Sequence, residues 1–117
     1  MSAITLEPTL TTDEARLEIG GELDLASVGE AQAALALLET SRPRRVVLDL
    51  RPLELIDSSG LRLLVDAERR ARRQGWSLVI AAHPEGPVRK LLSIVLLSER
   101  MPVVDDPDDV RSTVGPE

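Results

Sequence analysis

The residues best suited to chemistry in this sequence form the segment Asp57-Ser58-Ser59-Gly60. The serine hydroxyls can accept a phosphoryl group or cap a helix, and the aspartate can accept hydrogen bonds from backbone N–H groups. Apolar residues at helical spacing follow from Leu61 onward. A helix N-terminus carries unpaired N–H groups and the positive end of the helix dipole, so it favours anionic groups. The residues alone leave two interpretations open: a plain helix cap, or a site for a negatively charged group.

The element before this segment is a short, nearly continuous apolar run over 46–50. Such a run is typical of a strand buried on both faces of a parallel sheet. Arg51 and Pro52 end the run, because proline has no N–H for the ladder. A second, shorter group of apolar residues follows over 53–56. The sequence therefore predicts that a buried strand leads into a polar loop and then into a helix.

Several enzyme chemistries lack the residues they need. A phosphate-binding P-loop needs glycines followed by Lys-Ser or Lys-Thr, and the only lysine, Lys90, lies in no such motif. A serine hydrolase needs a base, and the G-x-S-x-G elbow is absent. A metal site needs more than one histidine, His83, and scattered carboxylates. Asp24 and Asp57 can be neighbours at one sheet edge, but no cofactor motif or aromatic pocket wall accompanies them, so we expect no enzyme activity, metal or cofactor.

Asp57 at the end of a strand is similar to the phosphoacceptor of response-regulator receiver domains. That site also needs acidic residues at the end of the first strand and a lysine after a later strand. Here the early strands end in Thr-Leu-Glu-Pro and Gly-Gly-Glu-Leu-Asp, and Lys90 lies inside a predicted helix. The receiver assignment is therefore disfavoured.

The composition bounds the class of protein. The 117 residues suffice for one domain with a sizeable core. Phe and Tyr are absent, so the core must be aliphatic. The net charge of −6 argues against nucleic acid or an anionic membrane as the main partner. No run approaches the roughly 20 apolar residues of a membrane span, and no signal peptide is visible, so we expect a cytoplasmic protein.

Strands and helices alternate along the chain. We expect a short edge strand interrupted at Pro8, a second strand ending in a bulge at Gly20-Gly21, and a helix capped by Ser27 with Glu30 completing a capping box. The later elements are expected as a helix from about Ser59 to Gln74, a strand over 77–82, a helix opened by Pro84 and Pro87, a strand over 102–104, and a short helix start over 106–109. The order predicts an α/β fold, a small mixed β-sheet with flanking helices. We expect a single domain over 1–117, with its core at about 3–104 and a short acidic tail over 105–117.

The run DLRPLELIDSSGL over 49–61 resembles the signature of the STAS domains, the family of bacterial anti-sigma factor antagonists. Gly21-Glu22-Leu23-Asp24 matches the second landmark of the family, at the expected distance upstream. The resemblance covers roughly 17–104. It implies the STAS-domain fold, which is the same small mixed sheet flanked by helices.

The resemblance also implies a function. In the family, the first serine of D-S-S-G is phosphorylated by a partner anti-sigma factor that is itself a serine kinase, and this serine is Ser58 here. The unphosphorylated form would bind the kinase and free the sigma factor, phosphorylation would dissociate it, and a serine phosphatase would reset it. The expected partner-binding residues are Asp24, Asp57, Ser58, Ser59 and Gly60. The alternative is a STAS scaffold or transport-associated subunit that is not a sigma regulator.

Two structural details complete this hypothesis. Ser59 is expected to lie nearer the helix and to bond a backbone N–H group, while Ser58 faces solvent and the partner. The helix N-terminus is expected to hold the charge of a phosphate, so that the fold need not change.

Overall fold

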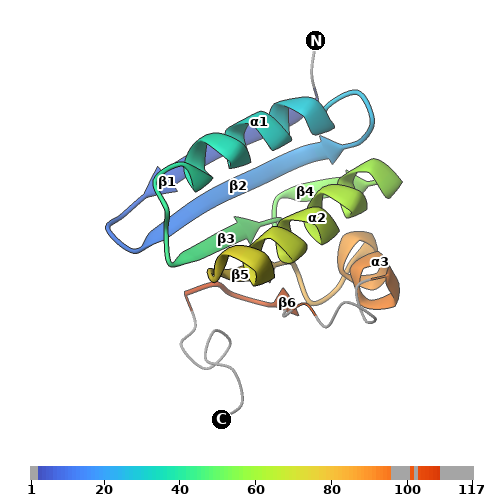
Figure 1. Cartoon of the computed structure of the whole chain (residues 1–117). Coiled ribbons are helices and arrows are strands. Elements are labelled where there is room, and N and C mark those ends of the chain that lie inside the picture. Colours follow the sequence, from blue (N-terminus) through green and yellow to red (C-terminus); the bar gives the residue numbers. More distant parts are fainter. Residues whose placement is uncertain (1–2, 96–100, 102, 109–117) are drawn as a thin grey trace.

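Residues 3–95, 101 and 103–108 are described in the computed structural model of the chain. They form one six-stranded sheet and three helices (Figure 1). The elements in chain order are β1 (Ile4–Leu10), β2 (Glu14–Leu23), α1 (Val28–Glu39), β3 (Arg45–Asp49), β4 (Leu53–Ile56), α2 (Ser58–Gln74), β5 (Ser77–Ala81), α3 (Pro87–Val95) and β6 (Val103–Val104). The sheet order is β1-β2-β3-β5-β6, and β4 pairs with β2 outside this path. β1 is antiparallel to β2 and the other pairs are parallel, which confirms the predicted mixed α/β fold.

β2 is the strand around which the sheet is built. Its first half, 14–18, runs parallel to β3, and its end, 21–23, runs parallel to β4. The register shifts between Gly21 and Glu22. Gly21 has a φ of +82°, and a Cβ at this position would overlap the carbonyl oxygen of Ala3. Only glycine fits both demands, and the predicted irregularity at the glycine pair is confirmed.

β4 was not predicted as a strand of its own. The chain turns at Arg51 and Pro52 and re-enters the sheet beside the far end of β2. The carbonyl oxygen of Pro52 accepts a hydrogen bond from the Gly21 N–H at 3.3 Å, which joins the turn to the bulge. β4 therefore delivers Asp57 to the sheet edge where β2 ends.

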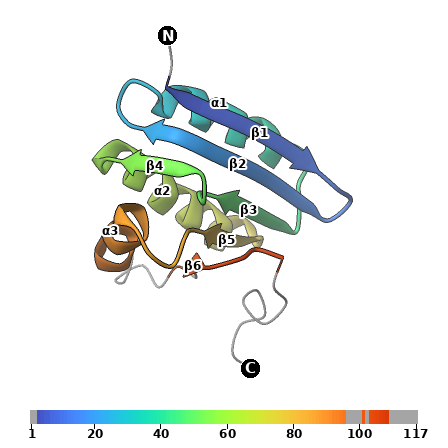
Figure 2. The ribbon, with the colours of Figure 1, turned by 180° about the vertical axis from the view of Figure 1, so that it is seen from behind.

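The main core lies between the sheet and the helices. α1 and α2 cover one face of the sheet (Figure 1), and from behind the strands lie in front of both helices (Figure 2). Fully buried side chains of this core come from three strands and three helices. They are Leu17, Ile19 and Leu23 of β2, Leu48 of β3, Ile80 of β5, Leu35 of α1, Leu64 of α2 and Leu92 of α3. All of them are aliphatic, as the missing Phe and Tyr predict. β1 differs from its prediction, because the strand continues through Pro8 and is not interrupted there. β1 is an edge strand, so the side of Pro8 that lacks an N–H can face solvent without loss of a ladder hydrogen bond.

The segment after β6 is attached to the body of the domain by arginine side chains. The contacts are Asp105 with Arg89 at 2.8 Å, Asp106 with Arg51 at 3.7 Å, the Pro107 carbonyl oxygen with Arg45 at 3.3 Å, and Asp108 with Arg16 at 2.8 Å. In the described part of the predicted helix start over 106–109, Pro107 and Asp108 form a turn. Residues 109–117 lie outside the described residues.

Asp49 is a buried charge at the end of β3, with an exposed fraction of 2%. Arg51 donates to both of its carboxylate oxygens, from Nε to Oδ1 at 2.9 Å and from Nη2 to Oδ2 at 2.8 Å. Burial alone would raise the pKa of Asp49. The hydrogen bonds and charge of Arg51 outweigh burial, so the pKa lies below its ordinary value. Asp49 is therefore charged at neutral pH, and its ionised form depends on Arg51.

Replacing Arg51 with leucine is expected to lower the free energy of unfolding by about 1–3 kcal/mol at neutral pH, because a buried carboxylate loses its partner. In the wild type the folded pKa of Asp49 is below the unfolded one. The pair therefore stabilises the fold above the unfolded pKa, and this contribution is lost as pH falls through the folded pKa. Without Arg51, burial favours the neutral carboxyl, so the gap between variant and wild type should shrink in acid. Urea unfolding at neutral pH and at about pH 3 measures the gap.

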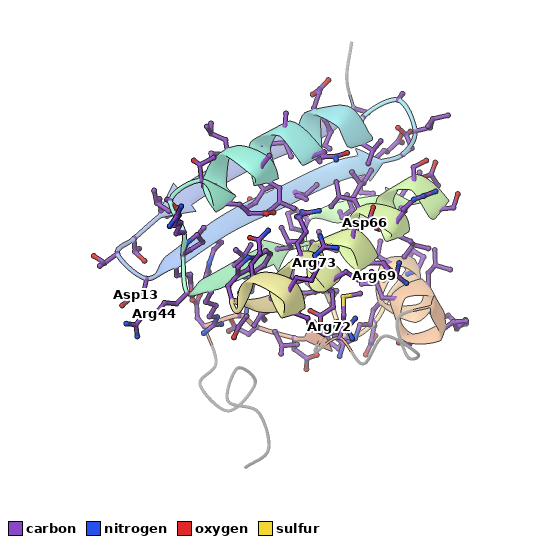
Figure 3. All side chains as sticks on the ribbon, in the orientation of Figure 1. Asp13, Arg44, Asp66, Arg69, Arg72 and Arg73 are labelled. Atoms are coloured by element: carbon purple, nitrogen blue, oxygen red, sulfur yellow. The ribbon has the colours of Figure 1, made fainter. Side chains whose placement is uncertain are left out.

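The matched control for this prediction is Arg44→Leu, because the Arg44 side chain is 88% exposed and lies 3.9 Å from Asp13 (Figure 3). Exposed pairs of this kind contribute little to stability. An equal loss in both variants, or a gap for Arg51→Leu that does not change with pH, would contradict the role given to Arg51.

Candidate functional site

The predicted site lies at the sheet edge where β2 and β4 end and where α1 and α2 begin, at the right of Figure 1. Asp24 follows β2, and Asp57 follows β4, which is the parallel neighbour of β2. The Asp57 N–H donates to the Leu23 carbonyl oxygen at 3.1 Å, and the Leu25 N–H donates to Asp57 Oδ2 at 3.2 Å. The structure thus brings the two aspartate segments together, as the sequence predicts.

Asp57 is the N-terminal cap of α2. Its Oδ1 accepts hydrogen bonds from the N–H groups of Ser59 at 2.8 Å and Gly60 at 3.3 Å, while Oδ2 accepts from Leu25. Of the two residue types that the sequence offers as caps, the aspartate takes the role, and the prediction that the Ser59 hydroxyl bonds a backbone N–H is wrong within the described residues. Asp57 competes better for the role, because an ionised oxygen is the stronger acceptor for backbone N–H groups. Both carboxylate oxygens of Asp57 therefore accept backbone hydrogen bonds, one set from the start of α2 and one from the loop after β2.

Replacing Asp57 with alanine is expected to lower the free energy of unfolding by about 0.5–2 kcal/mol through loss of the cap. It should also speed amide hydrogen exchange at Ser59 and Gly60, whose N–H groups lose their acceptor. Urea unfolding and exchange measured by NMR check both effects. Asp66→Ala on the exposed side of α2 is the control, and an equal response from the two variants would show that Asp57 is no special cap.

Asp24 organises the loop between β2 and α1. Its Oδ1 accepts hydrogen bonds from the N–H groups of Ala26 at 3.0 Å and Ser27 at 3.1 Å. The Ser27 hydroxyl donates to the Glu22 carbonyl oxygen at 2.8 Å and accepts from the Asp24 N–H at 3.0 Å. The predicted capping box is wrong, because Ser27 points back into the loop and makes no side-chain hydrogen bond to the first turn of α1. This loop is therefore held by its own polar groups.

The two serines differ in exposure. Ser58 is exposed at the first position of α2, and Ser59 is half-buried at the second. Neither hydroxyl makes a hydrogen bond within the described part of the chain. Gly60 is buried, and a Cβ there would lie 2.7 Å from Ile56 and 2.9 Å from Leu23. Glycine thus lets the first turn of α2 pack closely on the strand ends, which leaves Ser58 exposed at the corner of the domain.

A groove of about 320 Å³ runs between the N-terminal halves of α1 and α2 and begins beside these serines. It is lined by Leu25, Val28, Gln32, Ser59, Arg62, Leu63, Asp66 and Arg70. Leu25 is 77% exposed although it is apolar, and its N–H is held by Asp57. Sequence reasoning missed both Leu25 and Arg62. The only signal for Leu25 was its position as an apolar residue directly after Asp24 in a predicted loop.

A second hollow, of about 550 Å³, lies at the opposite ends of the same two helices. Trp76, the only aromatic residue, lines it together with Arg42 and Arg44. It contains none of the predicted site residues. Among the described residues, no group of three or more His, Cys, Asp or Glu side chains is placed to hold a metal ion.

The family model described as "Mlab, STAS domain" matches residues 7–104. This match covers most of the chain and includes both the Asp24 loop and the D-S-S-G segment. The chain belongs to the STAS domain family. The resemblance found in the sequence is thereby confirmed at the level of the family.

Solved structures show the same fold as this STAS domain. An anti-sigma factor antagonist from Mycobacterium paratuberculosis matches with a TM-score of 0.80 at 20% identity, over 91% of this chain and 89% of that chain. The anti-sigma factor antagonist SpoIIAA in its unphosphorylated form matches with a TM-score of 0.65 at 19% identity, over 89% of each chain. The phosphorylated form of SpoIIAA, a Bacillus cell fate determinant, matches with a TM-score of 0.65 at 21% identity, over 89% of this chain and 93% of that chain.

The STAS domain places its expected partner-binding residues at one corner. Asp24 and Asp57 hold the two loops, Ser58 is exposed beside them, and Ser59 and Gly60 complete the first turn of α2. No helix in the described ranges is both long and apolar enough to cross a bilayer.

Proposed function

We propose that this STAS domain is an anti-sigma factor antagonist controlled by phosphorylation of Ser58. In its unphosphorylated form it binds an anti-sigma factor that is a serine kinase, and the sigma factor is released. Phosphorylation ends this binding, and a serine phosphatase restores it. The domain is a regulatory binding module and a kinase substrate, not an enzyme. It acts in the cytoplasm, with a protein partner rather than nucleic acid or membrane.

The observation that carries this proposal is the exposed Ser58 hydroxyl on a corner fixed by Asp57 and Gly60. A kinase needs a hydroxyl that it can reach and orient, and Ser58 has no competing hydrogen bond within the described residues. Exposed Leu25 lies on the adjoining loop and offers an apolar contact beside the hydroxyl. The names of the matched anti-sigma factor antagonists, and the existence of a phosphorylated SpoIIAA, support the same assignment.

The transfer step assigns a role to each protein. The Ser58 oxygen attacks the γ-phosphorus of ATP bound to the partner kinase, a new P–O bond forms, the bond to ADP breaks, and the hydroxyl proton passes to a base on the kinase. The phosphatase uses water to release inorganic phosphate and restore the hydroxyl.

Charge explains why the modified form would leave the partner. A phosphate adds about −1.5 to −2 charges at neutral pH. It would stand beside Asp57 and near the Asp24 loop, both of which are already negative. Burying this extra charge under a docked partner costs desolvation energy that a neutral hydroxyl does not.

Capture of partners by the tagged wild-type chain from its own cells tests the proposal. The captured protein should be an ATP-dependent serine kinase that also binds a sigma factor. Leu25→Asp should reduce capture, whereas Leu37→Asp should not, because Leu37 is 73% exposed but lies at the far end of α1. Capture of a scaffold or transport assembly without any such kinase would favour the alternative STAS role.

A further inference from the structure

Three backbone donors at the start of α2 are already in use. The N–H groups of Ser59 and Gly60 donate to Asp57 Oδ1, and the Leu61 N–H donates to the Asp57 carbonyl oxygen at 3.0 Å. A phosphate on Ser58 therefore does not find these three groups available. The Asp57 carboxylate already accepts from the N–H groups of Ser59 and Gly60, so we expect the phosphate to need a further partner besides the helix N-terminus.

The charges around Ser58 leave one cation in a suitable place. Asp57 and Asp24 are acidic, and Asp66 lies two turns along α2. Arg62 lies one turn from Ser58, is exposed, and makes no ion pair within the described part of the chain. By contrast, neighbouring Arg70 is held by Glu39 at 2.8 Å.

The helical spacing brings the Arg62 side chain toward the serine. Residues four apart on a helix have Cβ atoms about 5–6 Å apart, and side chains lean toward the N-terminus of their helix. Arg62 and Ser59 also line the same groove, so Arg62 is close to the first turn. A guanidinium binds a phosphate through two parallel hydrogen bonds, which a long arginine chain can reach at this spacing.

The position of Arg62 is not explained by the helix dipole. Arg72 and Arg73 lie in the last turn of α2, where the negative end of the dipole favours cations (Figure 3). Arg62 lies near the positive end, where the dipole gives a cation no advantage. An anion introduced at Ser58 would give Arg62 an ion-pair partner one turn toward the N-terminus of α2.

We infer that Arg62 binds the phosphate of phosphorylated Ser58 at the end of the groove between α1 and α2. This inference rests on the proposed function and adds a positioning residue to it. In the unmodified form Arg62 faces a partner seated over the groove. In the modified form the phosphate competes for the same guanidinium, so phosphorylation changes the docking surface as well as its charge.

The test needs no kinase, because phosphoserine can be incorporated at position 58 during translation. The phosphate is then titrated by phosphorus NMR in the wild-type background, in Arg62→Gln, and in Arg73→Gln. Arg62 should lower the second pKa of the phosphate, which is ordinarily about 6, so Arg62→Gln should raise it by about 0.5 unit. Arg73→Gln should not, because Arg73 lies roughly 22 Å from Ser58 along the helix at about 1.5 Å per residue.

Asp24, Asp57 and Asp66 are present in all three proteins and cancel in the comparison. Arg62→Lys should recover part of the shift, since it restores the charge without the planar pair of donors. An equal phosphate pKa in the wild-type background and Arg62→Gln, or an equal change in Arg73→Gln, would overturn the inference. Failure of the proposed function would instead appear as absence of phosphate on Ser58 in a kinase assay, which this titration does not use.

Discussion

Replacing Leu48 with alanine is expected to lower the free energy of unfolding by about 2–5 kcal/mol. Leu48 is fully buried in β3, the strand between β2 and β5 that leads into the turn before β4. Alanine would leave a cavity in an aliphatic core in which close packing supplies much of the stability. Urea unfolding followed by circular dichroism measures the change.

The control for this prediction is Leu37→Ala, because Leu37 is equally apolar but 73% exposed. A surface change of this kind is expected to stay within about 0.5 kcal/mol of wild type. If Leu48→Ala unfolded at the same urea concentration as the wild type, β3 could not be the buried strand described above.

Charge at position 58 is expected to control partner binding. Ser58→Ala should bind the captured kinase as tightly as the wild type, because the docking surface loses only a hydroxyl. Ser58→Asp should bind about tenfold more weakly or worse, which corresponds to about 1.4 kcal/mol, because a carboxylate must be desolvated beside Asp57. Surface plasmon resonance with the purified kinase measures both dissociation constants.

The matched control is Thr12→Asp, which adds the same charge in the exposed turn between β1 and β2. It should leave the dissociation constant unchanged, and all three variants should unfold near the wild-type midpoint, because the substituted side chains are exposed. Equal weakening by Thr12→Asp would attribute the effect to net charge rather than to the site.

The sequence predicts those parts of the fold that depend on local residues. The predicted helix over 59–74 differs from α2 by one residue, because Asp57 and Gly75 mark its ends chemically, the glycine with a φ of +83°. β4 could not be predicted in this way. Its four residues have no alternating pattern, and they become a strand only by pairing with the second half of β2.

The attachment of the chain after β6 could not be predicted either. Arg16 and Asp108 are 92 residues apart in sequence, and no local pattern links them. Two strands separate β6 from β2 in the sheet, and the ion pair forms because the segment after β6 leads back past Arg45 of β3 to Arg16 of β2.

At the candidate site, sequence reasoning predicted the neighbourhood but not the hydrogen bonds. Parallel strands end at the same edge, so Asp24 and Asp57 were expected together. Which side chain caps which helix depends on loop geometry, and Ser27 turned inward while Asp57 took the cap. The groove forms where two helices pack together, and Arg62 lines it for the same reason. A pattern along the sequence does not show which helices will be neighbours.

The most direct test of the central claim is phosphosite mapping by mass spectrometry after the purified chain is incubated with its captured kinase and ATP. We expect phosphate on Ser58, none on Ser59, and none on the Ser58→Ala protein. Phosphate on Ser59, or on neither serine with a kinase shown to be active, would contradict it.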